Sequence, residues 1–386
     1  MSLVNRIVEL IKSDEGLIHV GLGNLVSSAA GGLFWFVLAS LIVVENYGEI
    51  NYLISIASVS SIATLFGLNT TVMTFIAKGS AEIRDQANTV ILISSIVTVP
   101  ILFLVANAYC ALLLAGMSFF SMSVAELLGK KSYRQYFVLV SAERAAQIVI
   151  AVLLYFQIGV NGIVLGYALG ALSFSYRYYK SVKNISFRIT ELRQRFRFIM
   201  HNYIFNISQT LTLHADKLII APLFGFTVLG LYQLGFQFLI FLAIVPSSMF
   251  QYLLPQYSSG RNMKRIMMIG LLLAGVLATI VIAFIPVVIT SVFPSYTEAI
   301  AAAQIMSIGV IPMTANSILN SKLLGKEKSK IVALGGLTYA GSLLILFSLI
   351  GTFLGLAGMG IALLISLCLQ TSVLSILPRF NQANKI

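Results

Sequence analysis

Long apolar stretches, separated by short polar joints, follow one another along the whole chain. A helix needs about 20 predominantly apolar residues to cross a bilayer. Twelve stretches meet this requirement, at 17–44, 50–77, 88–107, 109–128, 133–157, 160–180, 198–224, 228–253, 264–285, 299–322, 331–352 and 354–378. The pattern therefore predicts an all-α, polytopic membrane protein with about 12 transmembrane helices.

The distribution of basic residues supports this count. Lys and Arg collect in the cytoplasmic loops of membrane proteins. Here they occupy the N-terminus, every second predicted loop and the C-terminus, whereas the alternate loops carry acids such as Glu45, Glu49 and Glu298. A wrong helix count would scramble this alternation, so we expect a multi-pass protein of the cytoplasmic membrane with both termini in the cytoplasm. Apart from these basic residues of the termini, loops and adjoining helix ends, only Arg144 and Lys217 remain, and both fall inside predicted helices.

Composition agrees with a membrane setting and excludes several function classes. Hydrophobic residues make up 58% and charged residues 10% of the 386-residue chain, whereas soluble domains carry roughly 25% charged residues. The loops account for most of the net charge of +12, and no soluble basic domain is present to bind nucleic acid. The first apolar run is too long for the h-region of a signal peptide, so we expect the first helix to be retained.

Motifs for covalent chemistry are missing from the sequence. Cys110, Cys368 and the three histidines show no metal-ligand spacing. No nucleophile elbow, P-loop or dinucleotide fingerprint occurs. We therefore expect a protein that is not an enzyme, with no catalytic residue, metal or cofactor.

An internal repeat relates the two halves of the chain. Segments match in the same order at offsets of 182 and then 196 residues: Asn24-Leu25 with Asn206-Ile207, Gly48 with Gly230, Leu127–Lys130 with Leu323–Lys326, and Gly159–Gly162 with Gly355–Gly358. The change of offset implies an insertion of 14 residues in the second half. We place it at Pro286–Ile300, as an outer-face or re-entrant segment.

The repeat predicts the organisation of the whole chain. Because each half contains six helices, both halves begin on the cytoplasmic side and the repeat is parallel, a transporter arrangement with the substrate path between two bundles. The predicted parts are a cytoplasmic segment at 1–16, a six-helix bundle at 17–180, a basic linker at 181–197, a second six-helix bundle at 198–378 and a cytoplasmic tail at 379–386. The linker is either an amphipathic segment on the anionic inner leaflet or an ordinary cytoplasmic loop.

Three groups of residues resemble the polysaccharide transporter family. They are Phe66–Thr71 with Ala77-Lys78-Gly79, Asp216–Ile220 with Gly225 and Gly230-Leu231-Tyr232, and Leu323–Lys326. This family belongs to the multidrug/oligosaccharidyl-lipid/polysaccharide exporter superfamily and includes the O-antigen flippases. Twelve helices match it better than they match the fourteen-helix lipid II flippases.

The resemblance implies a fold, a substrate and partners. The fold would be a V-shaped pair of bundles around a central cavity, which carries lipid-linked sugar units to the outer leaflet. The substrate would be a polyprenyl-phosphate-linked glycan. Membrane lipids would surround the protein, and glycan polymerases or glycosyltransferases are candidate partners.

Cations inside the predicted helices are the sharpest candidate substrate contacts. A cation near a helix centre costs about 2.5–3.5 kcal/mol on insertion scales, so such groups usually face a polar interior. Lys217 shares a polar helix face with Asn206 and is expected to line the cavity, unless it snorkels to the outer interface. Arg144 lies eleven residues into its helix, about 16 Å at 1.5 Å per residue. With Gln147, it is expected to contact phosphate or sugar.

Two acids neighbour these cations. Adjacent residues diverge by about 100° around a helix, so Asp216 is not expected to pair simply with Lys217; it either bonds a neighbouring helix or couples transport to protons. Glu143 is likewise either a coupling group or a member of an ion pair, and the alternative for Arg144 is an inter-helix ion pair near the cytoplasmic end.

Weaker candidates complete the predicted site. Asn24 and Asn69 are expected to line the cavity, because both are polar residues inside apolar runs. Arg177 is placed at the cytoplasmic mouth, where it either captures phosphate or anchors the end of its helix.

The leading hypothesis is a flippase that translocates lipid-linked oligosaccharide or polysaccharide repeat units by alternating access. One alternative is a multidrug or organic-cation antiporter of the same superfamily, whose cavity would be rich in carboxylates and aromatic rings. The other is a non-transporting membrane scaffold in glycan assembly, which would tolerate loss of the cavity charges.

Overall fold

The computed structural model describes residues 15–80, 82–182, 186–258, 263–325 and 328–383. In these residues all regular secondary structure is helical, and no strand occurs. The predicted cytoplasmic segment at 1–16 lies largely outside the described residues, as do residues 183–185 of the predicted linker and 384–386 of the predicted tail.

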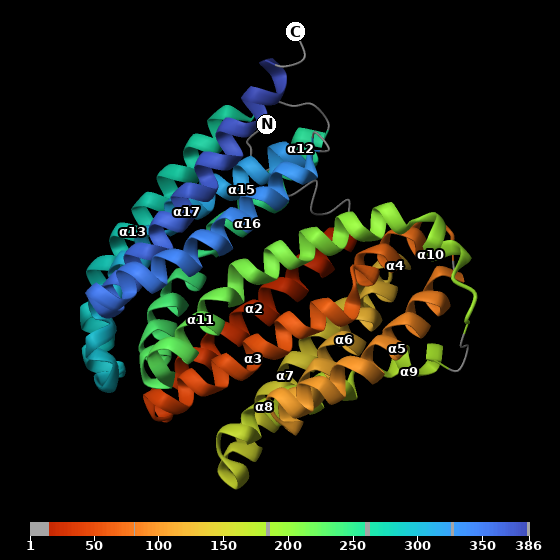
Figure 1. Cartoon of the computed structure of the whole chain (residues 1–386), viewed down its shortest axis with the longest axis horizontal. Helices are drawn as coiled ribbons and strands as arrows, with labels where there is room; N and C mark the ends of the chain where they lie inside the picture. The colour runs from red at the N-terminus through yellow and green to blue at the C-terminus, as the bar shows by residue number, and fades with distance from the viewer. Residues whose placement is uncertain (1–14, 81, 183–185, 259–262, 326–327, 384–386) are drawn as a thin grey trace. The chain divides into compact units, whose positions relative to one another are not determined.

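The helices follow one another with short connections (Figure 1). Those of the N-terminal half are α2 (Glu15–Leu41), α3 (Val44–Leu65), α4 (Leu68–Ala77), α5 (Glu82–Val105), α6 (Ala108–Gly129), α7 (Tyr133–Ile158), α8 (Val160–Ser173), α9 (Tyr176–Val182) and α10 (Thr190–Gln194). Those of the C-terminal half are α11 (Phe196–Leu242), α12 (Ile244–Ser258), α13 (Lys264–Val292), the 3₁₀ helix η1 (Pro294–Ala299), α14 (Ile300–Ile308), α15 (Val310–Leu324), α16 (Ser329–Leu346), the π-helical turn η2 (Phe347–Gly351) and α17 (Thr352–Ala383).

The described helices accommodate the twelve predicted spans. Eight are long and apolar enough to cross a membrane, and the bent pair of α3 and α4 makes nine. Two of them, Phe196–Leu242 and Lys330–Pro378, contain 47 and 49 residues, about twice the length that one crossing requires. Each is interrupted by a glycine with non-helical backbone angles, Gly225 or Gly355, and therefore supplies two spans. With the short apolar helix Val160–Ser173, the count reaches twelve, and the chain is an all-α, multi-pass membrane protein.

Apolar side chains cover the outer surfaces of these helices. Leu104, Phe156 and Phe353 are each more than 80% exposed, and α13 alone exposes eight large apolar side chains between Met268 and Val287. Soluble proteins rarely expose contiguous apolar patches of this kind, so these faces belong in lipid.

Some predicted boundaries are wrong for a physical reason. The helices predicted to begin at 50 and 88 begin instead at Val44 and Glu82. Glu45 lies in the first turn of α3, and Glu82 and Asp85 lie in the first turn of α5. Acidic side chains stabilise the first turn of a helix through the helix dipole. These acids were assigned to loops in the sequence, and they lie instead in the first turns of helices.

The bend between α3 and α4 falls within the Phe66–Thr71 motif. The two helices meet at 51°, and Phe66 and Gly67 have φ angles of 50° and 74°. A Cβ added at Gly67 would lie 2.7 Å from the Tyr203 nitrogen and 2.8 Å from the Ile199 oxygen. The close approach of α11 therefore requires glycine at this bend.

The chain forms two compact units. Unit 1 contains Met1–Phe34 and Ile56–Ile207, and unit 2 contains Trp35–Ser55 and Ser208–Ile386. In unit 1 a core of Leu, Ile and Val side chains joins α4, α5 and α6 to α9, whose Tyr178 is buried. In unit 2 a larger core surrounds Tyr232, Phe236 and Tyr339. Three helices, α2, α3 and α11, contribute residues to both units.

The internal repeat has a counterpart in backbone geometry. Gly159 has φ 64° and ψ −139°, and Gly355, 196 residues later, has φ 55° and ψ −138°. A Cβ added at Gly162 would collide with the Leu154 carbonyl, and one added at Gly358 would collide with the Ile350 carbonyl. Both pairs of contacts are related by the same offset, which confirms the repeat in this region.

The insertion in the second half extends a helix. The helix predicted to end at 285 continues to Val292, with Pro286 inside it, and η1 then leads into α14. Proline is tolerated inside membrane helices where the surroundings satisfy the freed backbone groups, so Pro286 did not mark an end.

Candidate functional site

The polar residues predicted to touch substrate fall into four local clusters. Three clusters lie in unit 1, around Arg144, Asn69 and Arg177. The fourth lies in unit 2, around Lys217. Each cluster is described below from its own contacts.

Arg144 lies deep in α7 and makes neutral contacts. The helix begins at Tyr133 as predicted, so the guanidinium cannot easily reach a helix end. Its Nε donates to Ser27 Oγ at 3.2 Å and its Nη1 donates to Gln147 Oε1 at 2.9 Å. Gln147 is buried and donates in turn to the Tyr167 carbonyl at 3.3 Å. The arginine side chain is therefore turned towards α2, with uncharged hydrogen-bond acceptors.

Close packing of α2 against α7 creates this arrangement. A Cβ added at Gly23 would lie 3.4 Å from Phe137 Cα, and one added at Gly31 would lie 3.8 Å from Arg144 Nε. Between these glycines, Asn24 Oδ1 accepts a hydrogen bond from the Tyr136 hydroxyl at 2.6 Å. Small residues let helix backbones approach, and here they bring polar side chains of both helices together.

Glu143 lies beside Arg144 in sequence but does not pair with it. Its side chain is buried, with 4% exposure. In the described part of the chain it forms no hydrogen bond or ion pair, and it affects Arg144 only through longer-range electrostatics. The predicted inter-helix ion pair is not found among the described residues, because Arg144 turns to the neutral acceptors Ser27 and Gln147.

A pair of asparagines links α4 to the beginning of α11. Asn206 Nδ2 donates to Asn69 Oδ1 at 3.3 Å. Asn69 follows the Phe66–Gly67 bend directly, so the bend sets its direction. The structure thus brings two predicted site residues together, at a distance of 137 positions in the sequence.

Lys217 is buried in a complete set of partners. Its Nζ lies 3.0 Å from both carboxylate oxygens of Asp216 and 2.7 Å from the Leu213 carbonyl. It also lies 4.1 Å from the ring centroid of Phe236. Tyr232 donates to the second carboxylate oxygen at 3.0 Å.

This cluster corrects two expectations. The lysine and the aspartate do pair, because the long lysine side chain folds back across the 100° that separates neighbouring positions. Lys217 does not snorkel to an interface, since its side chain is only 5% exposed. Its role as a substrate contact remains a prediction.

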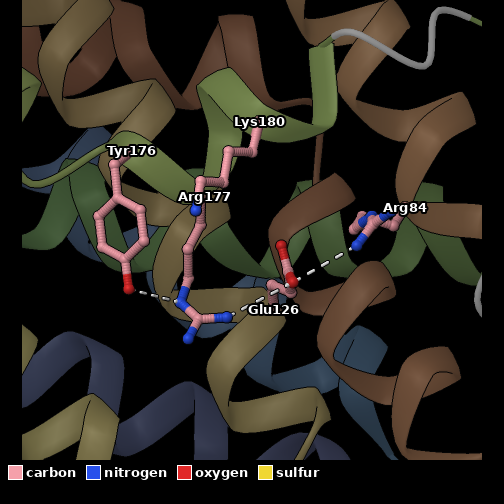
Figure 2. Close-up of a pocket in the computed structure, with 5 residues that line it drawn as sticks. All are labelled: Arg84, Glu126, Tyr176, Arg177 and Lys180. Atoms are coloured by element: carbon pink, nitrogen blue, oxygen red, sulfur yellow. Dashed lines mark hydrogen bonds and ion pairs between the residues drawn. The ribbon is translucent and has the colours of Figure 1, made fainter.

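Arg177 lines a basic cavity at one end of unit 1 (Figure 2). The cavity has a volume of about 390 Å³ and is lined by Arg84, Glu126, Tyr176, Arg177 and Lys180. Figure 2 shows Glu126 between the two arginines, at 3.4 Å from Arg84 and 3.7 Å from Arg177. Lys130, which follows the last residue of α6, also pairs with Glu126.

Sequence analysis identified Arg177 alone among the five lining residues of this cavity as a site candidate. For Arg84 and Lys180 the sequence predicted only positions in basic cytoplasmic loops. For Glu126 it predicted only a position in the apolar helix at 109–128. Glu126 is the single acid among the apolar residues of 109–128. Because a buried carboxylate requires partners, it could have indicated that basic residues gather around it.

The described residues hold no group of three or more His, Cys, Asp or Glu side chains that could bind a metal ion. The side chains of the four clusters form hydrogen bonds and ion pairs with one another.

Comparisons with known proteins relate the chain to transporters by fold. No protein-family model matches the chain, and no curated protein sequence matches it. A solved structure described as an inward-facing multidrug resistance MATE family transporter of the MOP superfamily matches with a TM-score of 0.72, 14% identity and 94% coverage of both chains. An outward-facing MATE family transporter matches with a TM-score of 0.64, 14% identity and 96% coverage of both chains.

A lipid II flippase is also similar in fold. The lipid II flippase MurJ, in an inward closed conformation, matches with a TM-score of 0.61 and 13% identity, over 93% of this chain and 79% of the flippase. The chain therefore has the fold of MOP superfamily transporters over nearly its whole length.

Proposed function

We propose that the chain is a membrane transporter of the MOP superfamily that translocates lipid-linked oligosaccharide or polysaccharide repeat units across the cytoplasmic membrane by alternating access. The fold supports transport, because solved proteins that share it include inward-facing and outward-facing transporters. The lipid II flippase of the same fold supports a lipid-linked substrate. Glycan polymerases or glycosyltransferases are proposed as partners, since they would consume or supply such a substrate.

Arg144 is the observation that carries the proposed substrate class. It is a cation deep in a membrane helix whose hydrogen-bond acceptors, Ser27 and Gln147, are neutral. Its charge is not cancelled by a contacting carboxylate among the described residues, in contrast to that of Lys217. An arginine fork binds phosphate oxygens in a bidentate manner, so Arg144 is suited to the anionic phosphates of a polyprenyl-phosphate-linked glycan.

The direct test is flipping in proteoliposomes. The probe is a fluorescent polyprenyl-diphosphate-linked N-acetylglucosamine, whose exposed fraction is measured by quenching from the outside. We expect Arg144→Ala to lower the initial flipping rate about tenfold to a hundredfold, because a hydrogen bond to a charged group contributes about 1.5–3 kcal/mol. Arg144→Lys should recover part of the rate, since it keeps the charge but loses the fork.

Arg265→Ala is the matched control, because Arg265 is an exposed arginine near the start of α13. It should flip the probe at the wild-type rate. Equal rates for wild type and Arg144→Ala, with equal amounts of folded protein, would remove Arg144 from the site. No flipping by the wild-type protein would favour the scaffold.

A multidrug or organic-cation antiporter is the second candidate, and Glu143 favours it. A buried carboxylate with no contacting cation among the described residues suits a cationic substrate or a coupling proton. This candidate predicts that the purified protein exports cationic dyes and that Glu143→Gln abolishes the export. The flippase predicts that Glu143→Gln leaves probe binding intact and changes at most its coupling.

A further inference from the structure

Two cavities adjoin each other at one end of unit 1. The first is the basic cavity of Figure 2. The second has a volume of about 560 Å³ and is lined by Arg134, Gln135, Val138, Leu139, Ser173, Phe174 and Tyr176. Tyr176 lines both, and Arg177 of the first donates to Gln135 of the second at 2.5 Å. We call them together the paired cavity.

The first cavity carries an excess of positive charge. Arg84, Lys130 and Arg177 contact Glu126, and Lys180, a fourth cation, also lines the cavity. The carboxylates in contact with these cations are Glu126 and Asp85. Four cations against two carboxylates leave a net charge of +2, so the cavity attracts an anion.

The arginine donors of this cavity are only partly used. Charge-assisted N–H···O contacts have lengths of about 2.7–2.9 Å when well formed. Arg84 and Arg177 approach Glu126 only to 3.4 Å and 3.7 Å. Arg84 also donates to Asp85 at 2.9 Å, and Arg177 donates to the Tyr176 hydroxyl and to Gln135. A guanidinium has five N–H donors, so each arginine retains donors for a phosphate beside Glu126.

The second cavity offers apolar walls. Val138, Leu139 and Phe174 contribute hydrocarbon and aromatic surface, and Val138 is 56% exposed. The hydrocarbon chain of a lipid bound here would contact these apolar side chains. Its polar end would lie near Tyr176, which also lines the first cavity, within reach of the arginines. The two cavities together match an amphiphile with a phosphate at one end.

The paired cavity lies at helix ends, and the ends of membrane-spanning helices are the parts that meet lipid headgroups. It is formed by the starts of α5 and α7 and by the ends of α6 and α8, with α9 beside them. Tyr178 fixes α9 there, because its ring stacks on Phe119 at 4.4 Å and its hydroxyl donates to the Asn88 carbonyl at 3.1 Å.

The segment that follows α9 packs on the same end of α5. Ser186 N donates to Thr89 Oγ1 at 3.0 Å, and Glu191 N donates to Gln86 Oε1 at 3.1 Å. The segment exposes apolar side chains next to exposed arginines: Phe187, Ile189 and Phe196 beside Arg188, Arg193 and Arg197. Basic and aromatic residues mixed in this way are typical of the interface with anionic lipid.

We propose that the paired cavity binds a membrane lipid, with the headgroup phosphate beside Glu126, in contact with Arg84, Arg177 and Lys180, and an apolar chain against Val138, Leu139 and Phe174. The site is separate from Arg144, and lipid binding there is independent of whether the chain transports a saccharide. The shared chemistry, a phosphate on an apolar chain, belongs both to anionic glycerophospholipids and to polyprenyl phosphates.

Native mass spectrometry of the full-length, delipidated protein tests this site. The probes are dioleoyl phosphatidylglycerol, undecaprenyl phosphate and dioleoylglycerol, which lacks the phosphate. We expect wild-type protein to retain phosphatidylglycerol or undecaprenyl phosphate, and Arg84→Gln/Arg177→Gln to bind it at least about tenfold more weakly, the equivalent of 1.4 kcal/mol. The better-retained probe identifies the source of the phosphate.

Arg265→Gln is the control for a lost arginine elsewhere, and a thermal unfolding curve of each variant verifies folding. If the double variant is unfolded, Arg177→Gln and Lys180→Gln are measured singly and should each weaken binding. Equal retention of both phosphate probes by folded wild type and variants would overturn the proposal. Equal binding of dioleoylglycerol and phosphatidylglycerol by the wild-type protein would overturn it as well.

Discussion

The ammonium of Lys217 has three kinds of partner within its own unit: a carboxylate, a carbonyl and an aromatic ring. Removal of one member of a buried ion pair leaves the other charge without compensation, which costs about 3–5 kcal/mol. Replacement of both members by neutral side chains removes this cost. The pair thus differs from Arg144, whose contacts are neutral.

This difference leads to a stability prediction at the residue scale. We expect Lys217→Met to destabilise the protein by about 3–5 kcal/mol, because it leaves the Asp216 carboxylate with the Tyr232 hydroxyl and a backbone N–H. Asp216→Asn/Lys217→Met should recover most of this loss, since asparagine carries no charge; its oxygen still accepts one of these hydrogen bonds, and its amide NH2 can donate to the Tyr232 hydroxyl. The measurement is thermal unfolding of the purified protein in one detergent.

Lys322→Met is the matched control, because Lys322 is exposed in the last turn of α15 in the same unit. Its unfolding temperature should equal that of the wild-type protein. If Lys217→Met is as stable as the wild type and yet flips the probe poorly, the ammonium acts on substrate rather than on the fold.

At the scale of whole elements, two glycines related by the repeat contact each other. A Cβ added at Gly48 in α3 would lie 2.8 Å from the Gly230 nitrogen in α11, and one added at Gly230 would lie 2.9 Å from the Val44 carbonyl carbon. Both glycines belong to unit 2. Backbone atoms cannot move aside as a side chain can, so this crossing requires glycine on both helices.

We therefore expect Gly48→Ala and Gly230→Ala to lower the yield of folded protein and its unfolding temperature. Each change should cost about 1–3 kcal/mol, the usual penalty for overpacking a filled interior. Gly275→Ala and Gly341→Ala are controls in α13 and α16, since an added Cβ meets no atom within 4 Å there. These two should be neutral or stabilising, because alanine favours helix by about 1 kcal/mol over glycine. Wild-type behaviour of Gly48→Ala would show that the helices separate at this crossing.

At the scale of the whole molecule, the sequence predicted the number of spans and the internal repeat, because both leave local or periodic signals in it. Apolar length gave the twelve spans, and the repeat gave matching backbone angles at Gly159 and Gly355. Helix starts at acidic residues were misplaced, because Glu45 and Glu82 stabilise first turns while also resembling loop residues.

Side-chain partners could not be predicted in the same way. Helix geometry alone separates Asp216 from Lys217, yet the flexible lysine chain returns to the carboxylate. The basic cavity is lined by residues of three helices that are far apart in the sequence. Its one indication in the sequence is Glu126, an acid among apolar residues. Pairings of this kind depend on tertiary packing, which has no local signal.

The number of crossings can be tested across the whole chain by its sidedness. Five spans separate Lys131 from Glu298 and six separate Lys131 from Lys330, provided that α11 supplies two crossings that meet at Gly225. Two residues separated by an odd number of crossings lie on opposite sides of the membrane, and two residues separated by an even number lie on the same side. Since Lys and Arg favour the cytoplasmic side, Lys131 and Lys330 should lie inside, and Glu45 and Glu298 should lie outside.

Single cysteines at these four exposed positions, in a Cys110→Ala/Cys368→Ala background, allow the measurement in intact cells. A membrane-impermeant maleimide should label Glu45→Cys and Glu298→Cys at once, and Lys131→Cys and Lys330→Cys only after permeabilisation. Labelling of Lys131→Cys and Lys330→Cys from opposite sides would mean an odd number of crossings between them. In that case either α11 or the short helix α8 would not supply the crossing assigned to it, and the prediction of two parallel six-helix halves would fail.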